Sequence, residues 1–134
     1  MPLTLIVFLQ RKSGTTPEFF KDYYENQHIP LAKEIARSSF PTHHRRHYLV
    51  RHPRNPTSTD PSNANYVPNV FAGEAEDFTW DVYVEMIFED MQHLQAFRAA
   101  LDAQRQRLAD DEKNFMDRSK VYLAEIEGPF GTGL

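Results

Sequence analysis

The chain has 134 residues, a formal net charge of -4 and no cysteine. A chain of this length can bury one continuous core, and we expect a single domain over residues 1–134. The absence of cysteine excludes disulfides, thiolate metal sites, thiol nucleophiles and iron–sulfur clusters. The negative charge argues against a general nucleic-acid binder, which needs a basic face. No apolar run is long enough for a transmembrane helix and no secretory leader is visible, so we expect a cytoplasmic protein without membrane partners.

The first half of the chain predicts a strand, a helix and a second strand. Residues 3–9 form a short apolar run with branched and aromatic side chains, typical of a central strand. Residues 16–18, Thr-Pro-Glu, combine an N-cap, a proline at the first helical position and an acid in the first turn, which together start a helix. Pro30 removes a backbone donor, so we expect a kink or break just after His28. Residues 42–51 alternate as a second strand.

The second half predicts a loop, a strand, a helical region and a last strand. Residues 52–76 are rich in Pro, Asn, Ser and Thr, which predicts a long loop that could act as a lid. Residues 80–88 alternate as a half-buried strand, residues 89–101 and 108–116 show helical spacing, and residues 121–126 form the last strand. This order is the ferredoxin-like βαββαβ arrangement, an α+β fold whose four-stranded antiparallel sheet carries its helices on one face.

The sheet face without helices is predicted to be partly polar and partly apolar. Its second and third strands would present His43, Arg45, His47, Asp81, Tyr83 and Glu85. The first and last strands would add aliphatic side chains, so the face is too apolar for ordinary surface and too polar for a dry core. We therefore predict a homodimer in which two copies pack face to face and enclose a partly wet cavity, as in a dimeric α/β barrel. The alternative is a monomer whose charged strand residues form solvated cross-strand ion pairs.

The leading candidate for general acid/base catalysis is His28. Imidazole titrates near neutrality, and the Pro30 interruption would aim this side chain away from a continuous helix. A histidine beside a kink could instead cap the carbonyls that the kink frees. Both readings place the side chain next to an irregular helical turn.

The second strand supplies further candidates for binding and catalysis. His43, Arg45 and His47 share one strand parity and would present two imidazoles and a guanidinium to one cavity, with His43 catalytic and the other two binding substrate. Arginine suits a substrate carboxylate or phenolate. A register error of one residue would exchange this set for His44 and Arg46. No metal is predicted, since alternate side chains on a flat strand run roughly parallel and the arginines repel cations.

The third strand supplies acidic candidates. Asp81 is the candidate catalytic acid or base, and Tyr83 and Glu85 are candidate substrate-binding residues on the same face. A structural ion pair across the strands is the alternative for the two carboxylates. The acids between residues 110 and 117 are interpreted as helix-surface and helix-end residues rather than as catalytic groups.

Five segments form a recognisable pattern: TPEFFKDYYENQHIPL at 16–31, FPTHHRR at 40–46, DFTWD at 77–81, FED at 88–90 and DDEKNFMDRSK at 110–120. Together they span nearly the whole chain and resemble EthD-domain proteins of the dimeric α/β-barrel superfamily. The combination is similar to the branch found in fungal aromatic-polyketide pathways. That resemblance implies a decarboxylase or dehydratase acting on an aromatic polyketide intermediate of secondary metabolism. The chain departs from the branch where His47 separates the paired arginines from Tyr48, and in its long loop.

The candidate residues suit either reaction. Decarboxylation needs a cation for the carboxylate, donors for the enolate and an acid that protonates carbon, which an arginine and two histidines can supply. Dehydration needs a base at the α-carbon and an acid at the leaving hydroxyl. Neither requires a cofactor, and no phosphate-binding glycine loop or dinucleotide fingerprint is present. The remaining alternatives are a cofactor-independent oxygenase or cyclase of the same barrel, and a non-catalytic dimeric protein that binds an aromatic intermediate.

Overall fold

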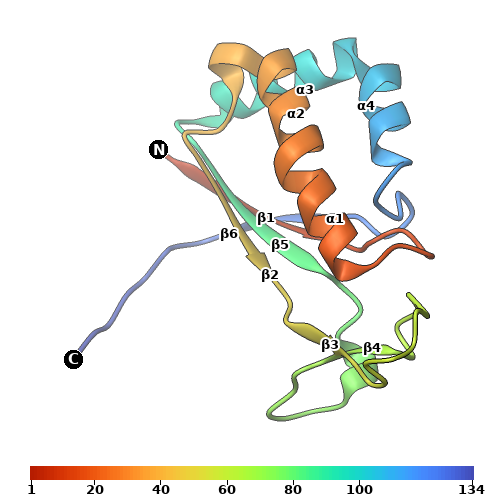
Figure 1. Cartoon of the computed structure of the whole chain (residues 1–134). Helices are drawn as coiled ribbons and strands as arrows, with labels where there is room; N and C mark the ends of the chain where they lie inside the picture. Colours follow the sequence, from red (N-terminus) through yellow and green to blue (C-terminus); the bar gives the residue numbers. More distant parts are fainter.

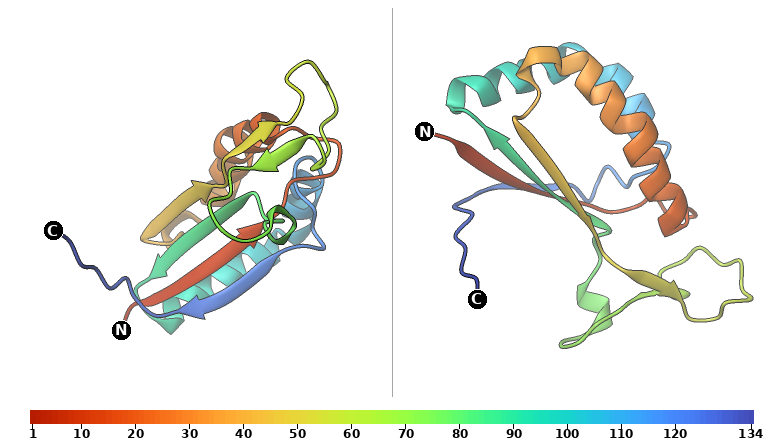
Figure 2. Two further views of the ribbon diagram at one scale, coloured as in Figure 1. Left: turned by 90° about the horizontal axis from the view of Figure 1, so that it is seen from below. Right: turned by 60° about the vertical axis from the view of Figure 1, so that its left-hand side comes forward.

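The computed structural model describes all residues from 1 to 134. Strands β1 (Leu3–Leu9), β2 (His43–Tyr48), β5 (Val82–Phe88) and β6 (Tyr122–Ile126) form one antiparallel sheet in the order β2-β5-β1-β6. Helices α1 (Pro17–Tyr23), α2 (Ile29–Ala36), α3 (Met91–Ala103) and α4 (Arg105–Glu112) cover one face of it (Figure 1). The other face is open, as the view in Figure 2 with the four strands in front shows. The predicted ferredoxin-like α+β fold is confirmed.

The core lies between the helices and the sheet. Along β5 buried and half-buried residues alternate strictly, as the sequence pattern predicts. The side chains that are almost wholly inaccessible are Phe20, Val82, Val84, Phe88 and Phe115. They join α1, β5 and the turn after α4, so the helix layer and the sheet share one core. No helix has the length and apolar character of a membrane-spanning segment.

The first helical region changes form just ahead of Pro30. A π-helical turn (Tyr24–His28) links α1 to α2, and the N–H of Ile29 bonds to the carbonyl of Tyr24. Pro30 has no N–H to donate to a carbonyl of the preceding helical turn. The π turn, which is wider than an α-helical turn, accommodates this missing hydrogen bond. The break expected just after His28 is therefore absent, because α2 begins directly at Ile29, and the irregularity is a π turn that ends at His28. Both Tyr24 and His28 are buried by it.

The segment between β2 and β5 is not one long loop. Strand β3 (Arg51–Pro53) pairs with β4 (Tyr66–Pro68), and a 3₁₀ turn covers Ala75–Asp77. This ribbon lies beyond the end of the main sheet, away from α3 and α4 (Figure 1). The sequence pattern missed it because each strand has three residues and contains proline, which is typical of edge strands and loops.

Two buried arginines tie the ribbon to the sheet. The carboxylate of Asp81 accepts hydrogen bonds from the backbone N–H and Nη1 of Arg11, at 2.8 and 3.2 Å, and from Nε of Arg51 at 2.9 Å. The three side chains are at most 5% exposed. The other guanidinium donors reach backbone carbonyls, those of Thr15 and Pro61 from Arg11 and those of Tyr66, Phe78 and Trp80 from Arg51. The expectation that Asp81 lies on the open sheet face is therefore wrong, because both of its oxygens are engaged in this buried network.

Candidate active site

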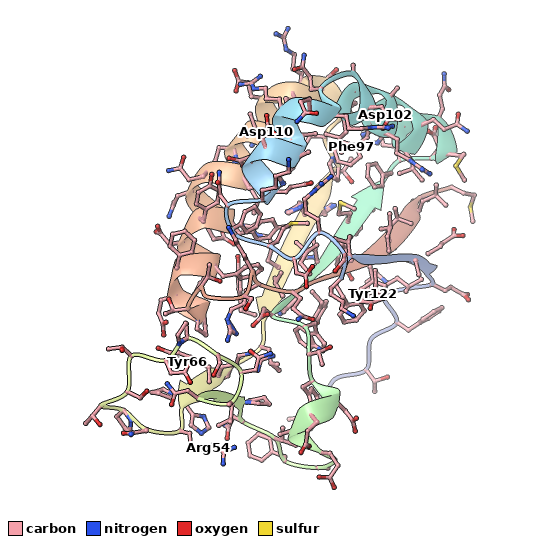
Figure 3. All side chains as sticks on the ribbon, turned by 90° about the vertical axis from the view of Figure 1, so that its right-hand side faces the viewer. Arg54, Tyr66, Phe97, Asp102, Asp110 and Tyr122 are labelled. Carbon is pink, nitrogen blue, oxygen red and sulfur yellow. The ribbon has the colours of Figure 1, made fainter.

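A cavity of about 670 Å³ lies between the helices and the sheet of a single chain. Most of its wall is apolar, with 17 of its 24 lining residues hydrophobic. Phe97 contributes from α3, which Figure 3 shows above the strands. The cavity opens beside β6, where Val121 and Leu123 line it and are 42% and 54% exposed. Its size and lining are those of a site for an apolar small molecule.

His28 forms part of the cavity wall and is held by a carboxylate. Its Nδ1 donates a hydrogen bond of 2.9 Å to Oδ2 of Asp111, while its Nε2 lies 3.9 Å from Oε2 of Glu112, another lining residue. The ring packs against Tyr24 and Phe115, with centroids 6.0 and 5.0 Å away. A carboxylate at Nδ1 fixes the orientation and the tautomer of a histidine, which leaves Nε2 to exchange a proton with a ligand.

A chain of hydrogen bonds fixes Asp111 in turn. Tyr23 Oη donates to Oδ1 of Asp111 at 2.6 Å, and Asn114 Nδ2 donates to Tyr23 Oη at 2.8 Å. Burial, and then the bond to Asp111, raise the pKa of Tyr23, so the phenol stays a donor. The interpretation of Asp111 as a helix-surface residue is wrong. The signal that could have found it is its spacing, three residues after the buried Leu108 on the same face of α4.

A second histidine, His44 of β2, lines the same cavity. Its ring packs against Phe40 and Tyr24, with centroids 5.4 and 6.4 Å away. Its Nδ1 is the one buried side-chain nitrogen or oxygen atom in the chain without a hydrogen-bond partner. Burial, and then the neighbouring Arg46, lower the pKa of His44 to about 4, so this imidazole is neutral at pH 7.

A charged cluster behind His44 joins β2 to the π turn. Arg46 donates to both oxygens of Glu25, through Nε at 3.0 Å and Nη2 at 2.5 Å, and Tyr48 Oη donates to the same carboxylate. These donors lower the pKa of Glu25, with Arg46 the larger cause. This cluster anchors the π turn, which carries Tyr24 and ends at the catalytic candidate His28.

The other strand residues favoured by the sequence lie on the opposite face of the sheet. Arg45 pairs with Glu85, with Nη2 of the arginine 2.9 Å from Oε1, and His47 stacks on Tyr83 at a centroid distance of 4.8 Å. His43 shares this face and is exposed. These residues share one face of the sheet, as the strand parity predicted. None of the five lines the cavity: His43, Arg45, His47, Tyr83 and Glu85. The sheet separates them from the histidine of the π turn.

The β3–β4 ribbon contributes nothing to the cavity wall. All lining residues come from positions 5–44 and 84–125. The segment that could act as a lid therefore lies outside the wall of this cavity. No group of three or more histidine, aspartate or glutamate side chains has a geometry that could hold a metal ion.

The fold and the cavity define a ferredoxin-like α+β domain with a partly buried histidine–carboxylate pair beside an apolar pocket between helices and sheet. The chain belongs to the EthD domain family, whose model matches residues 12–119. The predicted membership of the EthD family is thus confirmed. No curated protein matches the chain.

Solved structures support the fold. An EthD-like protein of Ralstonia eutropha JMP134 is 16% identical over 94% of this chain and 90% of its own, with a TM-score of 0.56. An EthD family protein of Bacillus halodurans C-125 is 18% identical over 96% of this chain and 100% of its own, with a TM-score of 0.55. A protein of Arabidopsis thaliana is 13% identical over 98% of this chain and 99% of its own, with a TM-score of 0.54. At such identities the likeness shows the fold alone.

Proposed function

We propose that the protein is a cofactor-free lyase that removes carbon dioxide or water from an aromatic polyketide intermediate in secondary metabolism. The observation that carries this proposal is the hydrogen-bonded pair of His28 and Asp111 at the wall of an apolar cavity. The apolar wall suits fused aromatic rings, and an oriented imidazole suits proton transfer. The resemblance of the sequence to fungal polyketide decarboxylases and dehydratases supports the same reaction class.

In a decarboxylation, His28 acts as the acid. The ring carbon that bears the carboxyl group takes a proton from Nε2 of His28, and a C–H bond forms. The bond to the carboxyl carbon then breaks, its electron pair restores the aromatic ring, and carbon dioxide leaves. Water returns a proton to the imidazole, while Asp111 keeps the ring in place through Nδ1.

In a dehydration, the same nitrogen acts first as base. Nε2 of His28 removes a proton from the carbon next to a ketone, and the electron pair forms the new double bond as the β-hydroxyl departs. The imidazole passes the proton to that hydroxyl, so water leaves and the enzyme returns to its starting state. Apolar walls keep bulk water from competing for the proton.

Replacing Asp111 by asparagine tests this function. With a panel of ortho-hydroxy aromatic acids and β-hydroxy ketones, we expect the wild type to release carbon dioxide or a dehydrated product. D111N should lose about 10-fold or more in kcat, because an amide no longer holds the productive tautomer. The matched control is D110N, whose side chain is 62% exposed. Absence of both products with every compound would contradict the proposal.

We further propose that the protein is a homodimer that buries its open sheet faces. The β1–β6 half of this face is apolar, with Ile6 opposite Ala124 and Phe8 opposite Tyr122. Tyr122 is 57% exposed, and these residues border a shallow apolar depression. A contiguous apolar patch of this kind marks an interface. The β2–β5 half supplies a polar rim, and each copy keeps its own cavity.

A lysine in the middle of the apolar half should prevent this association. We expect the wild type to sediment as a dimer at micromolar concentration and Ile6→Lys as a monomer, because pairing would bury one ammonium group from each copy in the apolar half of the face. Gln95→Lys, on the exposed side of α3, is the control with the same charge change. A wild-type monomer at micromolar concentration would overturn this proposal.

A further inference from the structure

The hydroxyl of Tyr24 has no hydrogen-bond partner in the protein. Tyr23 and Tyr48 each donate to a carboxylate, whereas Oη of Tyr24 takes part in no hydrogen bond. The residue is nevertheless only 5% exposed. Buried polar groups almost always have a partner, so an unpaired phenol at this depth indicates a partner from outside the chain.

A molecule in the cavity can reach this hydroxyl. Nδ1 of His44 is the one side-chain atom that lacks both a partner and accessible surface, so Oη of Tyr24, which lacks only the partner, keeps accessible surface. Tyr24 lines the cavity and none of three smaller depressions elsewhere on the chain. The rings of Phe20, His28 and Phe115 pack around it, with centroids between 5.8 and 6.2 Å away. This packing holds the phenol in place at the cavity wall.

The phenol is a hydrogen-bond donor at neutral pH. Burial raises the pKa of Tyr24 above its ordinary value, which outweighs the opposite effect of the Arg46 guanidinium. The hydroxyl therefore keeps its proton and offers it to an oxygen of the ligand. Beside an apolar cavity, such a donor stabilises negative charge on that oxygen more strongly than water does. The position suits a substrate whose oxygen gains charge during the reaction.

His28 lies next to the phenol and supplies the base for such a reaction. The two rings have centroids 6.0 Å apart. When Nε2 of His28 removes a proton from the carbon next to a ketone, the C–H electron pair forms a C=C bond and the carbonyl π pair moves onto oxygen. The enolate then expels the β-hydroxyl, which takes the proton from His28 and leaves as water. The charged oxygen is separated from the reacting carbon by two bonds, so it can lie on Tyr24.

We propose that Tyr24 donates a hydrogen bond to the carbonyl oxygen of the substrate and stabilises the enolate that His28 generates. The substrate is then a fused-ring aromatic ketone with a β-hydroxyl group. This inference rests on the proposed function in taking the cavity as the substrate site. It favours dehydration over decarboxylation, since removal of the α-proton places charge on oxygen, whereas protonation of a ring carbon draws electrons away from it. The phenol O–H bond stays intact throughout.

The binding test compares 1-tetralone with tetralin by titration calorimetry. Tetralin keeps the fused rings and lacks the carbonyl group. We expect the preference for the ketone over the hydrocarbon to be about 10-fold larger in the wild type than in Tyr24→Phe, because this variant removes only the donor. Tyr66→Phe, in β4 outside the cavity, is the matched control and should keep the wild-type preference.

Two further measurements separate a hydrogen bond to the ligand from a structural effect. The infrared C=O stretch of bound 1-tetralone should lie at lower frequency in the wild type than in Tyr24→Phe. With the best β-hydroxy ketone of the panel, Tyr24→Phe should lose about 100-fold in kcat, as expected for one oxyanion donor.

Three results would overturn the inference: an equal ketone preference in wild type and Tyr24→Phe, an unchanged C=O frequency, or failure of the wild type to bind 1-tetralone. Dehydration by Tyr24→Phe at the wild-type rate would also overturn it while leaving the lyase proposal intact. If only the lyase proposal fails, no panel compound is converted, but the ketone preference and the infrared shift remain.

Discussion

Replacing His28 by alanine is expected to lower turnover about 100-fold or more. The residue carries the transferred proton in both proposed reactions, and no other imidazole with a carboxylate partner lines the cavity. The loss should appear in kcat rather than in KM, because the apolar walls that bind the rings are unchanged. The measurement is steady-state release of carbon dioxide or of dehydrated product with the best compound of the panel.

The control for this variant is His52→Ala, since this exposed histidine of β3 lies outside the cavity. It should keep wild-type kinetics. If the His28 variant kept its turnover within about 10-fold of wild type, the loss would be too small for a residue that acts as general acid/base. The cavity would then serve to bind an aromatic intermediate, as the non-catalytic alternative holds.

Replacing Asp81 by asparagine is expected to destabilise the fold by about 3–5 kcal/mol. The carboxylate is the shared counter-charge of two guanidinium groups, those of Arg11 and Arg51, that are 5% and 1% exposed. An amide of the same size leaves both cations buried without a negative partner. The loss should be measured as the free energy of unfolding in urea at pH 7.

The same variant should expose the β3–β4 ribbon to protease, because Arg51 of β3 donates to the carbonyl of Tyr66 in β4 and to those of Phe78 and Trp80 just before β5. Asp77→Asn, an exposed neighbour on the same connection, is the control and should stay within about 0.5 kcal/mol of wild type. A loss below about 1 kcal/mol for the Asp81 variant would show that the buried network contributes little to stability.

The fold could be predicted because its signals are local. The alternation in β5, the Thr-Pro-Glu helix start and the apolar run of β1 each depend on a few neighbouring residues. The π turn also has a local cause in Pro30. The β3–β4 ribbon has no such signal, since it is stabilised by Arg51 and the distant Arg11 rather than by the pattern of its own strands.

The site was predicted only in part because it depends on which face of the sheet encloses space. Strand periodicity correctly grouped Arg45 with His47 and separated them from His44. It could not show that the cavity lies under the helices, since that depends on how far the helices stand from the sheet. Asp111 was missed because it meets His28 across 83 residues of sequence.

The most direct test of the account is a crystal structure with 3-hydroxy-2-naphthoic acid, which carries a hydroxyl next to its carboxyl group. We predict that the rings lie between helices and sheet, with the carboxyl-bearing carbon about 3–3.5 Å from Nε2 of His28. Binding on the open sheet face, against Arg45 and His47, would contradict the account and place the active site between two subunits.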